Sequence, residues 1–443
     1  MNRRQFLHRS AVAAASVFAF PAILRSASPN STLQVACIGV GGMGGGTMKG
    51  VASHPKVKIV ALCDVDDKYL NLAAKTYPDA SRCKDWRELL SRHAKEFDAV
   101  TIGTPDHVHA APTVMAIRAK KHVYLQKPMA PTLHECRVIT QEAAKFGVVT
   151  QLGNQGRSSI ESRMAVELIR GGAIGKIKEV ILWENKNLNW WPKNTELRPT
   201  ADPIPEGLDW DLWLGGCTPR PYLEGAYHPK QWRAWFDFGV GEMGDMGCHH
   251  FDTSFDALKL GAPLRVRQTT PGSSGPLWGK QRIVELIFKG TPMTAGKTVQ
   301  LTWHDGDLRP DLSRIILPKG IEKVPLSGTF WIGEQGAIYK TYGSARPFVL
   351  PEAGFPPEKY PRFKGQNHYH DWVDAILEGR KACSDFSHSG PLTETVLVGA
   401  VADRVAGQWL EWDSKALKFK NSAEATKLVR RAYRDGWKVA GLG

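Results

Sequence analysis

The sequence predicts an α/β protein in which a doubly wound parallel sheet is followed by an α+β part with an open, mostly antiparallel sheet. Three observations predict this fold. Between residues 33 and 153, short apolar runs alternate with helical patterns, which is typical of parallel strand–helix–strand units. The first run ends in a glycine-rich turn that opens a helix. Beyond residue 177, strand-like runs follow one another with short turns and few helices, which favours antiparallel pairing.

The predicted elements follow from these patterns in chain order. In the first part, strands are expected at residues 34–40, 57–64, 99–103, 123–125 and 148–152, with helices at 86–95, 110–120 and 133–146. In the second part, a helix is expected at 158–170, followed by strands at 177–184, 264–270, 282–288, 298–304, 328–332, 337–342 and 346–350. Helices at 369–377 and 393–409 are expected to cover the second sheet.

The turn after the first strand has the glycine spacing of a dinucleotide-binding loop. Gly39, Gly41 and Gly44 form a G-x-G-x-x-G pattern. The first glycine permits a tight turn, the second lets the backbone approach a pyrophosphate, and the third lets the helix pack on the strand. Unpaired N–H groups at the helix start, around Gly42 and Met43, would face the anion. The chain has 43 glycines, so the surrounding strand and helix carry the argument.

An acidic residue follows the second predicted strand. Asp64 stands 20 positions after Gly44, where a carboxylate accepts hydrogen bonds from the ribose hydroxyls of an adenosine. No arginine follows it to bind a 2′-phosphate, so the sequence predicts NAD rather than NADP. A glycine-rich turn followed by a helix-capping aspartate is the alternative interpretation.

Two further strand ends carry polar residues, where ligands of such sheets bind. Thr104, Pro105 and His107 follow the strand at 99–103 and are candidates for lining the nicotinamide pocket. An ordinary Thr-Pro turn capped by Asp106 is the alternative. Lys127 follows the next strand and precedes a helix-starting proline, so it is held at the rim of the sheet. A catalytic lysine is one interpretation, and an ordinary surface lysine is the default alternative.

A second polar, glycine-rich stretch at residues 239–252 opens an apolar helix predicted at 251–260. Asp245 and His249 are four residues apart, which places both side chains on one face of a helix. A carboxylate beside an imidazole fixes its tautomer, as a general base requires. Two alternatives remain: a metal site, or an N-capping aspartate beside a histidine whose hydrogen bonds are made within the protein core. The stretch does not supply a complete set of metal ligands, so no metal is predicted.

Together these residues resemble the Gfo/Idh/MocA family, the glucose–fructose oxidoreductase and inositol dehydrogenase group, from residue 33 to about residue 260. The family's E-K-P motif reads Gln126-Lys127-Pro128 in this chain, so a glutamine stands where the family has a glutamate. The resemblance implies a catalytic group of Lys127, Asp245 and His249. Gln126, Lys127 and Asn154 complete the expected cofactor contacts.

The resemblance also implies roles and a function. His249 would remove the proton of a substrate hydroxyl, Lys127 would donate to its oxygen, and Asp245 would orient His249. We therefore expect an NAD(H)-dependent oxidoreductase that acts on a sugar or polyol hydroxyl and keeps its cofactor tightly bound. A redox-neutral, NAD-dependent glycosidase or lyase of the same family is the alternative. A non-catalytic sugar-binding relative is disfavoured because Lys127 and His249 are both present.

The N-terminal residues resemble a twin-arginine signal peptide. Arg3 and Arg4 precede Phe6-Leu7 and an apolar stretch at 11–24, and small residues follow. We expect residues 1–27 to be this signal, with export to the periplasm and membrane contact only through export. A basic amphipathic helix is the alternative. The expected domains are then residues 33–153, a Rossmann domain that binds NAD, and residues 154–443, a domain for substrate and oligomerisation.

Charge and cysteine content limit the partners. The net charge is +14, and the expected signal holds four arginines and no acidic residue, so 14 − 4 = +10 remains. We find no lysine/arginine cluster and no nucleic-acid module, and we predict a small carbohydrate substrate, no nucleic acid and a homo-oligomer. Seven scattered cysteines without a C-x-x-C motif support neither a disulfide framework nor a zinc site.

A long loop rich in tryptophan and proline separates the two chemical stretches, at residues 190–235. Tryptophans usually serve packing, but several on one loop also suit stacking against the apolar faces of a sugar ring. In that case Asp209 or Arg233 would supply polar contacts to the sugar hydroxyls. Both interpretations of this loop remain open from the sequence.

Overall fold

The computed structural model describes residues 32–443 except 186–190, 192–199, 312, 314–317, 320, 322–324 and 344–345. The expected signal peptide, residues 1–27, lies outside the described residues. Within the described part of the chain, no helix has the length and apolar character needed to cross a bilayer.

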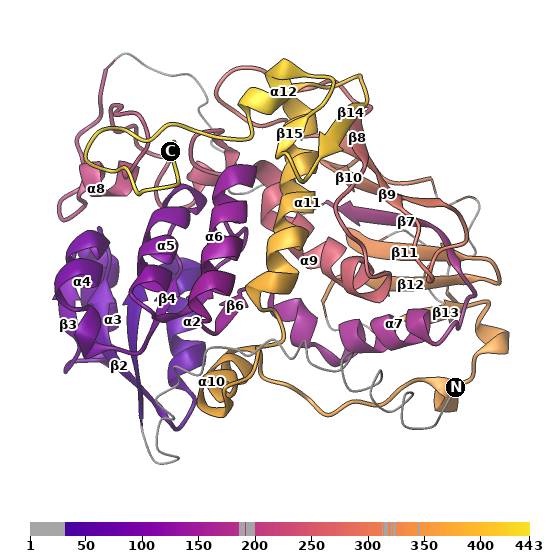
Figure 1. Ribbon diagram of the computed structural model, residues 1–443, viewed down its shortest axis with the longest axis horizontal. Coiled ribbons are helices and arrows are strands. Elements are labelled where there is room, and N and C mark those ends of the chain that lie inside the picture. The colour runs from indigo at the N-terminus through magenta and orange to yellow at the C-terminus, as the bar shows by residue number, and fades with distance from the viewer. Residues whose placement is uncertain are drawn as a thin grey trace, which may run out of the picture.

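The first sheet is parallel and has six strands in the order β3-β2-β1-β4-β5-β6 (Figure 1). Its strands are β1 Leu33–Ile38, β2 Val57–Cys63, β3 Ser81–Cys83, β4 Ala99–Ile102, β5 His122–Leu125 and β6 Thr150–Leu152. Its helices are α2 Gly42–Ala52, α3 Asp67–Thr76, α4 Trp86–Arg92, α5 Ala110–Arg118 and α6 Leu133–Phe146. The strand order reverses between β1 and β4, so the crevice for a ligand lies at the carboxyl ends of these strands.

The second sheet has nine strands in the order β13-β12-β11-β7-β10-β9-β8-β14-β15. They are β7 Ile177–Glu184, β8 Arg265–Gln268, β9 Arg282–Lys289, β10 Thr298–Asp305, β11 Ser327–Gly333, β12 Ala337–Thr341, β13 Phe348–Leu350, β14 Leu410–Asp413 and β15 Lys418–Phe419. All neighbouring pairs are antiparallel except β7 and β10. The predicted fold class is confirmed, and β3, β14 and β15 are short strands that the sequence pattern did not reveal.

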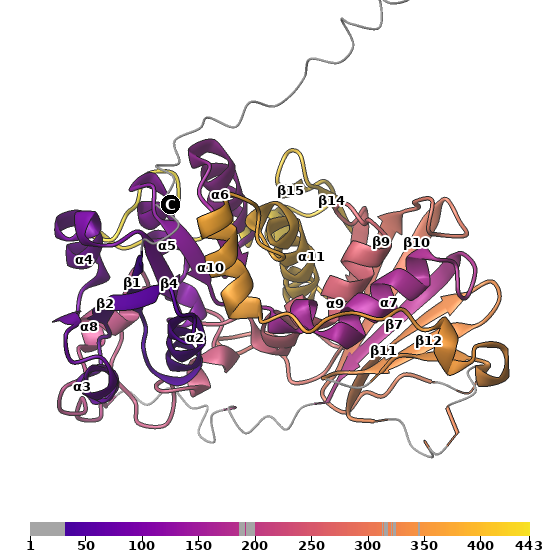
Figure 2. The ribbon, with the colours of Figure 1, turned by 90° about the horizontal axis from the view of Figure 1, so that it is seen from below.

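Helices α9 (Gly241–Ala257) and α11 (Phe386–Arg404) lie between the two sheets, and α7 (Ile160–Arg170) packs against α9 along the second sheet (Figures 1 and 2). The predicted start of α9 at residue 251 and the predicted start of α11 at residue 393 were both wrong. Both helices begin earlier, but their first turns contain glycines or Pro391, which have low helix propensity and do not indicate a helix in the sequence. In α9 the glycines serve packing, because a Cβ on Gly247 would lie 2.9 Å from the Val396 side chain of α11.

Two later segments return to the first sheet. Helix α10 (His368–Glu378) packs on α2, and the ring of Tyr369 stacks on that of Tyr124 from β5. The C-terminal segment is anchored by Arg431, whose buried guanidinium bonds to the Glu135 carboxylate of α6 and to the carbonyl oxygen of His107. The two sheets are therefore joined by several segments of chain, which fixes α9 relative to the first sheet.

Two glycines of α2 provide a matched test of this packing. A Cβ on Gly44 would lie 2.0 Å from the carbonyl oxygen of Gly39, whereas a Cβ on Gly46 would meet no atom within 4 Å. We expect Gly44→Ala to lower the free energy of unfolding by about 3 kcal/mol through overpacking. Gly46→Ala should raise it by about 0.5–1 kcal/mol, because alanine is the better helix former. Urea unfolding of both variants checks the pair, and equal effects would contradict the close helix–strand approach.

Candidate active site

The glycine turn is built largely as predicted. Gly39 has φ +76°, and a Cβ there would lie 2.7 Å from the backbone of Gly103. Gly41 differs from the prediction, because the ring of Tyr69 fills the space beside it, 2.7 Å from where a Cβ would be. The open position is Gly42, at φ +47° with no atom within 4 Å of its Cβ position. Met43 follows it and is 51% exposed, so the start of α2 is free for an anion.

Asp64 ends the next strand at the same edge of the sheet. One carboxylate oxygen accepts the backbone N–H of Val40 at 2.8 Å, and the other accepts the N–H of Asp66 at 3.0 Å. Burial raises the pKa of this carboxyl above its ordinary value, and the two N–H groups oppose the rise. A carboxylate offers about four lone-pair positions, so two remain for the hydroxyls of a ribose.

Lys127 crosses from the first sheet to α9. Its ammonium donates to the carbonyl oxygen of Asp245 at 2.6 Å and to the carboxylate Oδ1 of the same residue at 2.8 Å. The two side chains are 12% and 9% exposed. Arg233 donates from Nε to the same Oδ1 at 3.3 Å. Since an ammonium has three N–H donors, one of those on Lys127 is left for another acceptor.

His249 lies one turn further along α9. Its Nδ1 is buried and has no hydrogen-bond partner among the described residues. Burial, helped by the nearby charge of Lys127, lowers the pKa of the imidazole to about 3. The ring is therefore neutral at pH 7, as a proton acceptor must be. The Oδ1 of Asp245, the residue predicted to orient His249, accepts from both Lys127 and Arg233, so this carboxylate also positions the ammonium of Lys127.

Tyr342 and His250 border this group. The Tyr342 ring lies 5.6 Å from that of His249 and 5.0 Å from that of His250 between centroids. His250 is buried, and its Nε2 pairs with the carboxylate of Glu184 from β7 at 2.9 Å. These contacts give His249 an aromatic wall on the side of the second sheet.

Asp106 is a member of the site that sequence reasoning missed. It was considered only as a capping residue of the Thr-Pro turn, but its carboxyl accepts a hydrogen bond from the backbone of Val240 at the start of α9. It is 5% exposed, and burial raises its pKa to about 7, against the opposing charges of Arg233 and Lys127. Its position after β4, at the same edge as Lys127, was the signal that could have identified it.

The protonation of Asp106 leads to a pH prediction. The unfolded chain loses this proton near its ordinary pKa of 3.8 and the folded chain near 7. Relative to Asp106→Asn, the free energy of unfolding of the unmodified protein should therefore fall as pH rises from about 4 to about 7. Denaturant titrations of both proteins across this range measure the difference, and parallel curves would contradict the assignment.

The other predicted cofactor residues divide into two groups. Thr104 has a buried hydroxyl and Asn154 a buried amide nitrogen without a partner among the described residues, so each can serve a ligand. Gln126 instead donates to Thr47 of α2 at 2.6 Å. His107 donates to the carbonyl oxygen of Trp213 at 2.8 Å, and its ring packs 4.9 Å from that of Phe238. The structure therefore places His107 among packed aromatic rings.

Pro105 lies with Thr104 in the loop after β4. His109 connects this loop to the loop after β5, which carries Lys127. The two ring nitrogens of His109 face the carbonyl oxygens of Pro128 at 2.7 Å and of Thr104 at 2.9 Å. Burial lowers the pKa of this imidazole to about 4, so one of the two contacts lacks a proton at pH 7. The histidine nevertheless holds the loops after β4 and β5 together, and with them Thr104 and Lys127.

The aromatic loop serves packing in its described part. Its rings form one buried cluster with Leu208, Leu214 and Phe238. The aromatic members are Trp210, Trp213, Tyr222, Tyr227, Trp232 and Trp235. The guanidinium of Arg233 lies 4.3 Å above the Trp232 ring and points its Nε at Asp245. Trp191, near the start of this loop, is buried, while Trp190 lies outside the described residues.

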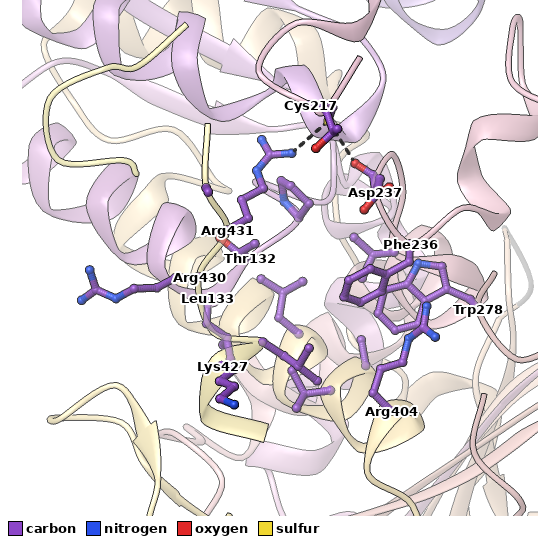
Figure 3. A pocket seen from close by; sticks show the side chains of 18 residues that line it. Thr132, Leu133, Cys217, Phe236, Asp237, Trp278, Arg404, Lys427, Arg430 and Arg431 are labelled. Carbon is purple, nitrogen blue, oxygen red and sulfur yellow. Dashed lines mark hydrogen bonds between the residues drawn. The ribbon is translucent and has the colours of Figure 1, made fainter. Parts of the chain in front are cut away.

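A cavity of about 290 Å³ lies beside the C-terminal segment (Figure 3). Phe236 and Trp278 form part of its wall, and the guanidinium of Arg404 stacks over both rings at 4.2 and 4.9 Å. Neither Lys127 nor His249 lines it, so it is separate from the predicted catalytic group. Within the described residues, no cluster of histidine, cysteine and carboxylate side chains could hold a metal ion.

Two models of one family match this chain. Residues 33–154 match the model described as oxidoreductase family, NAD-binding Rossmann fold, and residues 159–269 match the one described as oxidoreductase family, C-terminal alpha/beta domain. The chain belongs to the Gfo/Idh/MocA oxidoreductase family. Its first sheet is accordingly the NAD-binding Rossmann fold of that family, which confirms NAD as the predicted cofactor. The open start of α2, the free lone pairs of Asp64 and the unpaired Thr104 hydroxyl fit a dinucleotide.

Curated members of the Gfo/Idh/MocA family are similar over part of the chain. The D-glucoside 3-dehydrogenase of Escherichia coli (strain K12) is 28% identical over 155 residues, which are 35% of this chain and 44% of that protein. A glycosyl hydrolase family 109 protein of Solibacter usitatus (strain Ellin6076) is 33% identical over 165 residues, 34% of this chain and 37% of that protein. The chain spans about two fifths of the length of the curated relatives it matches.

Solved structures show the same fold over most of the chain. The WlbA dehydrogenase from Bordetella pertussis, solved in complex with NADH and UDP-GlcNAcA, matches with a TM-score of 0.61 and 16% identity. The match covers 86% of this chain and 99% of that one. The likeness shows that the parallel sheet and the mostly antiparallel sheet of this member of the Gfo/Idh/MocA family are arranged as in that structure.

Proposed function

We propose that the protein is an oxidoreductase that uses tightly bound NAD to oxidise or reduce a hydroxyl-bearing carbon of a sugar or polyol. The observation that carries this proposal is the bridge between the two parts of the chain. Lys127, at the rim of the NAD-binding sheet, is hydrogen-bonded to Asp245 on the helix that also bears His249. A proton acceptor and a cation thereby meet at the carboxyl edge of the nucleotide-binding sheet.

His249 and Lys127 can both act on the hydroxyl oxygen of the substrate. When bound, NAD supplies a nicotinamide ring that exchanges a hydride with the substrate carbon. His249 takes the hydroxyl proton through Nε2, because its Nδ1 is buried. Lys127 donates its third N–H to the same oxygen and stabilises the negative charge that develops there. Asp245 holds the ammonium of Lys127 in place, and Arg233 donates to the same carboxylate oxygen.

A redox-neutral glycosidase or lyase is the second candidate. The similarity to a glycosyl hydrolase family 109 protein, at 33% identity, is the observation that favours it. In such a reaction a sugar hydroxyl is oxidised transiently, the neighbouring C–H becomes acidic, the glycosidic bond eliminates, and the hydride is returned. The same two residues, Lys127 and His249, would serve the oxidised carbon in both candidates.

Absorbance and product analysis separate the two candidates. Protein purified without added NAD is expected to carry the cofactor and to absorb near 340 nm after reduction. A panel of free sugars, polyols and aryl glycosides is then added. An absorbance at 340 nm that persists indicates the oxidoreductase, whereas release of the aglycone without a net change indicates the redox-neutral enzyme. Protein that neither contains nor binds NAD would refute both.

Export and assembly belong to the same proposal. The twin-arginine-like residues Arg3 and Arg4 support export of the folded, NAD-loaded protein to the periplasm. Free NAD is expected to be scarce there, which is the reason to propose a cofactor that stays bound through turnover. A homo-oligomer formed through the second sheet completes the proposal. Fractionation of cells that express the full chain, followed by size-exclusion chromatography with light scattering, tests both points.

A further inference from the structure

A segment of the second part lies across the outer strands of the nucleotide-binding sheet. This segment, residues 200–229, is called the strap below, and it contains helix α8 (Trp210–Leu214), which lies beside that end of the sheet in both views (Figures 1 and 2). The backbone N–H of Asp67 donates to Gly207, and that of Asp209 donates to Val65. Lys84 also donates its ammonium to the Gly207 carbonyl at 2.9 Å. The strap is thus bonded to the loop that follows Asp64.

The strap is also held at the C-terminal end of α8. His107 donates to the carbonyl oxygen of Trp213, and Arg434 of the C-terminal segment donates to that of Gly215 at 2.6 Å. Trp210 and Trp213 stack at 4.6 Å inside the strap. Hydrogen bonds on both sides of α8 and a packed aromatic core make it a preformed element.

The last residues of the strap bring a histidine to the adenosine side of the site. His228 pairs through Nε2 with the carboxylate of Asp66 at 2.9 Å. Its ring meets that of Tyr69 nearly edge-on, with 6.0 Å between centroids. The Tyr69 ring is the one that packs on Gly41, and the charge of His228 also favours the ionised form of Asp64. His228 and Tyr69 therefore lie beside the glycine turn and the neighbouring carboxylate that is expected to bind the ribose.

We propose that the strap closes over the adenosine half of bound NAD, with His228 of the strap and Tyr69 of α3 as the contact residues, and that it sets the rate of cofactor release. This inference rests on the proposed function, since it explains how the NAD would be retained. The nucleotide leaves only when the His228–Asp66 pair and the Tyr69 contact open. Because the strap is hydrogen-bonded on both sides of α8, this opening is slow, and the cofactor stays bound between turnovers.

The test measures NADH release rather than turnover. The protein is loaded with NADH, an excess of NAD is added as a chase, and the loss of NADH fluorescence is followed. His228→Ala should release NADH about tenfold faster or more, as expected when an interaction of about 1.4 kcal/mol is lost. His228→Gln keeps a donor for Asp66, so its NADH release rate should lie between that of the unmodified protein and that of His228→Ala. His93→Ala is the matched control, because His93 pairs with Glu96 at the far end of α4.

Thermal melting without cofactor shows whether each variant folds, and release rates are compared only among folded variants. If the unmodified protein binds no NADH, the proposed function fails. If it binds NADH and His228→Ala releases it at the rate of the unmodified protein, the strap is not the retaining element and the inference is wrong. A release rate raised in His228→Ala but not in His93→Ala supports it.

Discussion

Replacing Lys127 by methionine is expected to lower kcat for the proposed sugar oxidation by about 10²–10³, the usual cost of removing a donor that stabilises a developing oxyanion. Methionine keeps the length of the side chain and removes the ammonium. Asp245 would keep Arg233 as its partner, so the fold of α9 should persist. The measurement is the initial rate of NADH formation with saturating substrate, together with the NAD affinity of the variant.

The control for this substitution is Lys145→Met on the exposed last turn of α6. It removes the same charge far from α9 and should leave the rate unchanged. Lys127→Met should also bind NAD, because the glycine turn and Asp64 are intact. Turnover of Lys127→Met at the rate of the control would exclude the ammonium from the reaction.

Replacing His249 by alanine is expected to reduce the rate by about 10²–10⁴, the range for loss of a general base. The structure adds a prediction about pH. Because burial lowers the pKa of His249 to about 3, this ring should not cause the rate to fall between pH 8 and pH 5. Burial raises the pKa of the Asp106 carboxyl to about 7, so a fall in rate near pH 7 should disappear in Asp106→Asn, which lacks this carboxyl.

Addition of imidazole distinguishes a missing base from a damaged site. The cavity left by His249→Ala lies at an aromatic wall that includes Tyr342, so a free imidazole can occupy it. We expect imidazole to restore part of the rate in His249→Ala and to leave Lys127→Met unaffected. Unchanged activity of His249→Ala without imidazole would show that another group accepts the proton.

The sequence predicted local features well and long-range partners poorly. The strand and turn around Gly39 and Gly44 depend on neighbouring residues, and the structure shows both glycines in the tight places that their spacing indicated. The pairing of Lys127 with Asp245 joins residues 118 apart. It depends on how α9 packs against the first sheet, which no local pattern encodes, so only the family resemblance brought the two residues together.

Residues with two plausible roles were the hardest to assign. Asp106 follows a Thr-Pro turn and looked like a cap, yet the packing of the second part buries it beside Lys127 and Arg233. Similarly, the tryptophans of the aromatic loop suited either packing or sugar stacking. The structure puts Trp210 and Trp213 in a buried cluster, where they pack with the leucines of the same loop.

The most direct test of the account follows the hydride itself. NAD-loaded protein is mixed with methyl glycosides that carry deuterium at one ring carbon at a time, the reaction is quenched within a single turnover, and the cofactor is examined by mass spectrometry. The account predicts deuterium on the nicotinamide from one ring position, and its disappearance in both Lys127→Met and His249→Ala. Deuterium transfer that persists in both variants, or protein that holds NAD and takes deuterium from no position, would contradict it.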